Sequence, residues 1–288
     1  MEGTQKPLIK FGWLRAVIYM VIIALVVLIF QILSPYISNL FEPGTESGDE
    51  NIVSFGVLYF CMGLCIFAAT WLCRKFIDRR SFESLGFTWK GYSNEAGLGF
   101  FASIALLGIG TLILVAIKYL TFTSASFDFG SLFLEVVLLL IVAFIEELLF
   151  RGYLLNNLMQ SLNKWIALSV VSVLFALFHQ TNPDVSLLAI VNIVVAGFLL
   201  GLNYIFTKNL WFGIFFHFAW NYFQGPVLGY DVSGLQFGSI LQQTITGPEL
   251  WTGGAFGFES SLLCPLLFIV AILVFTYAFL KRYQPKVP

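Results

Sequence analysis

Apolar residues fill most of this chain in long runs, and short polar stretches separate the runs. A helix needs about 20 predominantly apolar residues to cross the hydrocarbon core of a bilayer. The pattern therefore predicts an all-α, polytopic membrane protein of about eight transmembrane helices. We place them at 16–33, 52–73, 96–117, from near Leu132, from near Trp165, and at 187–206, 210–223 and 262–280.

Composition supports the membrane assignment. The 288 residues are 59% hydrophobic and only 11% charged, whereas soluble domains contain about 25% charged residues. A net charge of −1 gives no basic surface for nucleic acid. No repeat or change of composition divides the chain, so we expect a single integral membrane domain, 1–288, with the lipid bilayer as its surroundings.

Basic residues are distributed unevenly between the two sets of predicted loops. With the N-terminus inside, the inner segments hold thirteen Lys and Arg, and the outer loops hold Lys118 alone. This bias predicts a multi-pass protein of the cell membrane with both termini in the cytoplasm. The glycine-rich loop at 224–260 then falls on the outer face, opposite the expected opening of the site described below.

Two adjacent carboxylates, Glu146 and Glu147, and the arginine Arg151 interrupt one of the most apolar stretches. A charge inside the membrane costs about 2.5–3.5 kcal/mol on insertion scales and by default marks a functional position. Glu147 and Arg151 are four residues apart with the acid first, the favourable order for a helical ion pair. Glu146 points about 100° away, so it can face a cavity as a general base or acid.

The only two histidines, His179 and His217, also lie in predicted helices, and Asn221 follows His217 by one turn. Glu146 is 17 residues before Asn163 and His179 is 16 residues after it. A helical hairpin that turns at Asn163 would therefore bring Glu146 and His179 to the same depth. We expect the diacid, the two histidines and the asparagine to meet in one intramembrane site.

The spacings EExxxR at 146–151, FxxxH at 175–179 and HxxxN at 217–221 occur in this order. Together they resemble the three motifs of the CAAX protease and bacteriocin-processing family. These intramembrane proteases include the eukaryotic prenyl-protein endopeptidase and the bacterial Abi proteins. The resemblance covers the segment 132–223, which we take as the motif-bearing catalytic core.

The resemblance implies eight helices around an intramembrane cavity and hydrolysis of a membrane-associated peptide, prenylated or carrying a leader, on the cytoplasmic side. The resemblance also implies roles for the motif residues of this chain. Glu146 would activate water, and His179 would position that water or protonate the leaving amine. His217 and Asn221 would bind the oxyanion, and the neighbouring ion pair would brace the site. Amide hydrolysis needs both an activated water and donors for the oxyanion.

Two points stay open at this stage. If a divalent metal such as zinc is bound, Glu146, His179 and His217 would be its ligands. The chain has no HExxH sequence, and we slightly favour chemistry without a metal. The natural substrate and the oligomeric state are also open.

Two other functions fit parts of the pattern. A non-catalytic regulator or bacteriocin-immunity protein on the same scaffold would keep its function without the two site residues Glu146 and His179. A proton-coupled transporter could use the diacid, but the chain shows no paired inverted repeats. The other polar residues within predicted helices, interpreted as packing residues, are Glu135, Asn192 and Asn203.

Overall fold

We describe the protein from a computed structural model, which covers residues 6–41 and 52–283. Residues 1–5, 42–51 and 284–288 lie outside the described residues. The longer helices are α1 (Gly12–Phe41), α2 (Ile52–Leu72), α3 (Ser93–Ala116), α4 (Phe129–Glu147), α6 (Lys164–Phe178), α7 (Leu187–Leu202), α9 (Trp211–Tyr222) and α11 (Leu263–Tyr283). The short elements are helices α5 (Asn156–Leu158), α8 (Tyr204–Thr207) and α10 (Glu249–Thr252) and strands β1 (Leu120–Ala125) and β2 (Leu241–Ile245).

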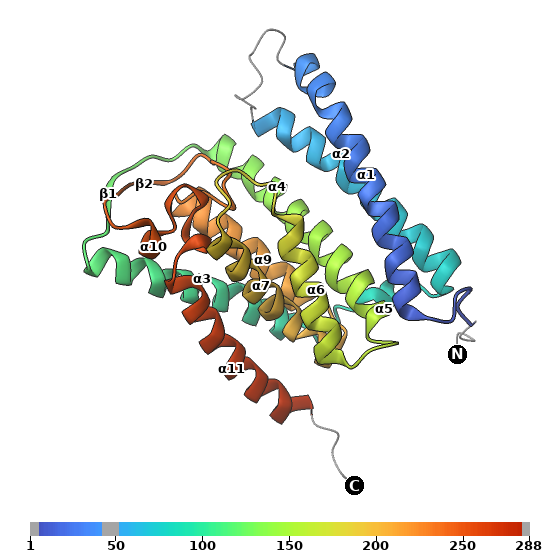
Figure 1. Cartoon of the computed structure of the whole chain (residues 1–288). Helices are drawn as coiled ribbons and strands as arrows, with labels where there is room; N and C mark the ends of the chain where they lie inside the picture. Colours follow the sequence, from blue (N-terminus) through green and yellow to red (C-terminus); the bar gives the residue numbers. More distant parts are fainter. Residues whose placement is uncertain (1–5, 42–51, 284–288) are drawn as a thin grey trace.

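A helix occupies each of the eight predicted membrane segments (Figure 1). Within the described ranges, five helices are long and apolar enough to cross a membrane: α1, α2, α3, α11 and the continuous α7–α8 helix. Helix α6 has 15 residues and α9 has 12, so these two are shorter. The protein is thus mostly helical and multi-pass, and eight full crossings stay a prediction.

The fold is mostly helical but not purely α-helical as predicted, because it also contains a two-stranded β-ribbon. Strand β1, in the connection from α3 to α4, pairs antiparallel with β2, with Leu120 opposite Ile245. Figure 1 shows this ribbon at one edge of the bundle, remote from the first turn of α1 and the last turn of α11. The pairing places the α3–α4 connection and the 224–260 segment on the same side of the bundle, as the predicted topology requires.

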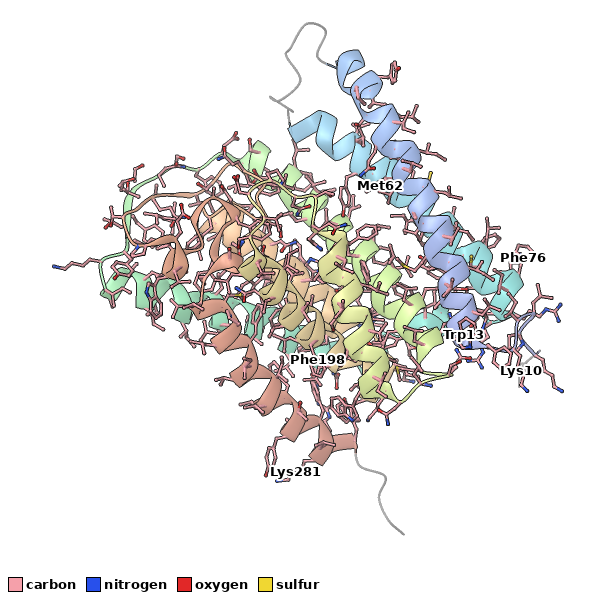
Figure 2. The ribbon with its side chains drawn as sticks, viewed as in Figure 1. Lys10, Trp13, Met62, Phe76, Phe198 and Lys281 are labelled. Carbon is pink, nitrogen blue, oxygen red and sulfur yellow. The ribbon has the colours of Figure 1, made fainter. Side chains whose placement is uncertain are left out.

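Buried charges join several elements at the other end of the bundle. Asp78 accepts hydrogen bonds from Arg15 at 2.9 Å and from Arg74 at 2.7 Å, and all three side chains are buried. Asn157 also donates to Asp78, at 3.2 Å. Figure 2 shows Trp13 and Phe76 at this same end of the α1–α2 pair. The network fixes the start of α1 to the end of α2 and to α5.

The helices that carry the motifs form the centre of the bundle. Helix α6 packs against α7, and α9 packs against α3 and α4. Glycines allow the close approach that membrane helices use. A Cβ at Gly99 would lie 2.3 Å from the carbonyl oxygen of Phe212, and one at Gly197 would lie 3.0 Å from Cα of Ser172.

Candidate active site

A cavity of about 280 Å³ brings together four of the six predicted site residues. Glu146 from α4, His179 from the end of α6, and His217 and Asn221 from α9 all line it. The rest of its wall is mostly apolar, with contributions from α1, α2, α7 and α11. A few charged and polar groups in a mostly apolar cavity are the usual setting of an active site.

The two adjacent carboxylates point in different directions, as the sequence predicts. The side chain of Glu146 is 15% exposed and faces the cavity, whereas that of Glu147 is completely buried beside it. Helix α4 ends at Glu147, and the chain continues directly as a π-helical turn over Leu148–Leu155. Such turns are frequent at functional sites, and this one begins at the residue after the diacid.

Glu147 and Arg151 form the predicted ion pair. The Arg151 Nη1 atom lies 2.7 Å from Glu147 Oε1, and Arg151 Nη2 donates to the carbonyl oxygen of Gly197 at 2.9 Å. The guanidinium carbon also lies 4.5 Å from the centre of the Phe175 ring. Both charged side chains are fully buried. The pair therefore connects the end of α4 to α6 and α7, directly behind the cavity.

Both histidines present Nε2 to the same carboxylate oxygen. His179 follows the last residue of α6, and its Nδ1 lies 2.8 Å from the carbonyl oxygen of Phe175. His217 Nδ1 lies 3.3 Å from Glu147 Oε1. Each of these acceptors requires a proton on Nδ1. With Nδ1 directed at its acceptor, each ring turns Nε2 toward the Glu146 carboxylate, so the two Nε2 atoms meet there. They lie 3.9 Å (His179) and 3.8 Å (His217) from Glu146 Oε2. The predicted common depth of Glu146 and His179 is confirmed.

The segment after α9 forms part of the cavity, which the sequence did not indicate. The sequence predicts a glycine-rich loop over 224–260, opposite the opening of the site. Instead it contains β2 and α10, and its side chains complete the cavity wall at Val232, Ser233, Leu235, Phe237 and Glu259. We call the stretch 231–261 the roof segment.

Polar side chains of the motif-bearing region hold the roof segment in place. Asn192 donates to the carbonyl oxygens of Glu259 at 2.7 Å and Ser261 at 2.8 Å. Asn182 donates to the carbonyl oxygen of Ser233 at 3.0 Å. Asn192, interpreted from the sequence as a packing residue, thus fastens the roof segment, and it also lines the cavity.

Three side chains of the site, Glu146, His179 and His217, are the candidate ligands of a metal ion. Zinc binds nitrogen and oxygen ligands at about 2.0–2.2 Å in tetrahedral geometry. In the part of the chain that the structure describes, no group of three His, Cys, Asp or Glu side chains is arranged to hold a metal ion. Glu146 Oε2 lies 3.9 and 3.8 Å from the Nε2 atoms of His179 and His217, and these three side chains do not form such a group. No step of the reaction is therefore assigned to a metal.

A substitution at Gly213 on α9 tests the packing behind the site. A Cβ there would lie 2.6 Å from Glu147 Oε2 and 3.3 Å from the carbonyl oxygen of Leu200. Overpacking of this kind costs about 1–3 kcal/mol, and small displacements of reacting groups cost about a hundredfold in rate. We expect Gly213→Ala to lower both the thermal unfolding temperature and any peptide cleavage. Gly108→Ala is the control, because a Cβ at Gly108 would meet nothing within 4 Å; equal behaviour of the two variants would contradict the close packing.

Part of the chain matches a known protein family. Residues 128–223 match the family described as type II CAAX prenyl endopeptidase, Rce1-like. The matched segment begins at Asp128, whose side chain caps the start of α4, and ends just after α9. It contains all six predicted site residues. No curated protein and no solved structure matched the chain.

Proposed function

We propose that this protein, whose residues 128–223 form an Rce1-like type II CAAX prenyl endopeptidase domain, is an intramembrane endopeptidase that uses Glu146 to activate water. The family is one of peptide-bond hydrolases. One observation carries the assignment of the base. Glu146 Oε2 faces the Nε2 atoms of His179 and His217 at 3.9 and 3.8 Å inside the cavity. A water bound between these three groups would lie against a base and two imidazoles.

The first step is attack by water. Glu146 takes a proton from the water, and the hydroxide adds to the carbonyl carbon of the scissile peptide bond. The negative charge then moves to the carbonyl oxygen. Asn221 can donate its amide hydrogens to that oxyanion. His217 can donate from Nε2 as an imidazolium, which the adjacent Glu147 carboxylate stabilises through Nδ1. Donors aimed at a developing oxyanion are commonly the largest single contribution to catalysis.

The second step is departure of the amine. The proton that Glu146 has taken is passed to the leaving nitrogen, directly or through Nε2 of His179. The Phe175 carbonyl holds His179 in the tautomer with a free Nε2, so this nitrogen can accept a proton and give it up again. The Glu147–Arg151 pair stays ionised throughout and keeps α4, α6 and α7 in register. The product carboxylate and amine then leave the cavity.

The substrate class follows from the surroundings of the site. Apolar side chains dominate the cavity wall, and large apolar side chains such as Leu25 and Leu273 are exposed on α1 and α11. A peptide held at the bilayer by its own apolar part is therefore favoured over a soluble one. The family implies a prenylated protein as the substrate. A leader peptide held in the membrane is likewise a peptide with an apolar part in the bilayer. The positive-inside bias orients both termini toward the cytoplasm, and cleavage on the cytoplasmic side stays a prediction.

The test is proteolysis in liposomes. The purified protein is incubated with a library of membrane-anchored peptides, with and without an isoprenyl group, and new peptide termini are detected by mass spectrometry. We expect the wild type to cleave with or without a zinc chelator, and Glu146→Gln to cleave more slowly by a factor of about 10²–10⁴. Peptides anchored to only one side of oriented vesicles identify the side of cleavage. Equal product from the wild type and Glu146→Gln would contradict the proposal, and a Glu146→Gln variant that keeps its cellular role would favour the non-catalytic regulator.

A further inference from the structure

A tyrosine outside the matched segment contacts the proposed base. Tyr59 on α2 donates its hydroxyl hydrogen to Glu146 Oε1 at 2.8 Å and lines the same cavity. We infer that Tyr59 is a positioning residue, which fixes one oxygen of Glu146 so that the other faces the two histidines. This inference rests on the proposed function, because it concerns the base of that reaction.

The two oxygens of Glu146 have different surroundings. Oε1 accepts the Tyr59 hydrogen bond. Oε2 is buried and has no hydrogen-bond partner among the described residues, and it is the oxygen that faces both imidazoles. The terminal torsion of a glutamate is broad and roughly two-fold, so an unrestrained carboxylate would rotate. A hydrogen bond to a charged acceptor is roughly twice as strong as a neutral one, and here it selects one orientation.

The packing of α2 against α4 makes this contact possible. Gly63 lies one turn after Tyr59, and a Cβ at Gly63 would lie only 3.2 Å from Cγ1 of Ile145. The missing side chain therefore allows α2 to approach α4 at the residue next to Glu146. The phenol then reaches the carboxylate across the α2–α4 interface.

The surroundings of Tyr59 argue against a purely space-filling role. Met62 on α2 and Val27 on α1, which line the same cavity, are apolar. A phenylalanine would fill the same volume, and a buried hydroxyl costs free energy unless it is hydrogen-bonded. The hydroxyl of Tyr59 is bonded to the carboxylate of the base. The site is thus built from the matched segment together with α2.

The test compares Tyr59→Phe with the wild type in the liposome assay. Removing the hydroxyl keeps the ring and lets the carboxylate rotate, so kcat is expected to fall about 10- to 100-fold. KM and the thermal unfolding temperature are expected to stay at their wild-type values, because the ring still packs. Tyr277→Phe is the control, since Tyr277 is 69% exposed on α11; its kinetics are expected to match the wild type.

Each other outcome has a defined meaning. A wild-type kcat in Tyr59→Phe beside an inactive Glu146→Gln overturns the positioning role and leaves the proposed function in place. A raised KM with unchanged kcat also overturns it, because Tyr59 would then act on substrate binding alone. A loss of activity accompanied by a lowered unfolding temperature assigns Tyr59 to the fold and not to the base. Full activity in Glu146→Gln overturns the proposed function and this inference together.

Discussion

Replacing Glu146 with glutamine is expected to lower the rate of peptide cleavage by a factor of about 10²–10⁴, the usual contribution of a general base. Glutamine has the same shape, and its amide oxygen can still accept the hydrogen bond from Tyr59. It cannot take a proton from water. Glu146 has no arginine or lysine partner among the described residues, so the substitution leaves no orphaned cation. The single-turnover rate at saturating peptide, measured beside thermal unfolding in detergent, checks both expectations.

The matched control is Glu135→Gln. Glu135 is another carboxylate on α4, and it is buried but does not line the cavity. If the effect of Glu146→Gln came from the loss of any buried charge in this helix, Glu135→Gln would lower the rate as well. We expect Glu135→Gln to cleave at the wild-type rate. Equal losses in the two variants would refute the assignment of Glu146 as the base.

Replacing Arg151 with methionine is expected to destabilise the protein by about 3–5 kcal/mol, the usual cost of leaving a buried charge without its partner. The substitution removes the 2.7 Å bond to Glu147 and the 2.9 Å bond to the Gly197 carbonyl. Glu147 would then be a fully buried carboxylate whose remaining neighbour is His217. The midpoint and slope of denaturant unfolding in mixed micelles give the free energy.

Two further variants separate the lost ion pair from other effects. The double variant Glu147→Gln/Arg151→Met removes both charges and is expected to recover part of the loss, because non-additivity is the signature of a direct pair. Arg80→Met removes an exposed arginine and is expected to change stability by less than about 0.5 kcal/mol. A double variant no more stable than Arg151→Met would show that the pair is not the source of the loss.

Most of the helices could be predicted from the sequence because their signal is local. Each long apolar run became a helix, and the hairpin turn at Asn163 was correct: its side chain accepts from the backbone N–H of Trp165 and caps α6. The β1–β2 ribbon could not be predicted in this way. Its strands are short and separated by more than a hundred residues, and no hairpin turn connects them.

The contacts of the site likewise divide into local ones, which residue spacing predicts, and contacts between distant segments, which it does not. Glu147 and Arg151 are four residues apart, and the spacing of a helix predicts their contact. The meeting of Glu146 with His179 followed from equal distances to one turn. Tyr59 is 87 residues from Glu146, and the roof segment follows the last motif. Their places depend on how whole helices pack, which one sequence does not encode in any local spacing.

The two imidazoles of this protein have a consequence for spectroscopy. The chain contains two histidines, and both line the cavity. When the protein is purified without a polyhistidine tag, every ¹⁵N-histidine signal in its nuclear magnetic resonance spectrum therefore comes from this cavity. The hydrogen bonds to the Phe175 carbonyl and to Glu147 place a proton on each Nδ1, so two Nδ1–H resonances are expected. A chemical reagent selective for histidine would likewise report on this cavity and on no other part of the molecule.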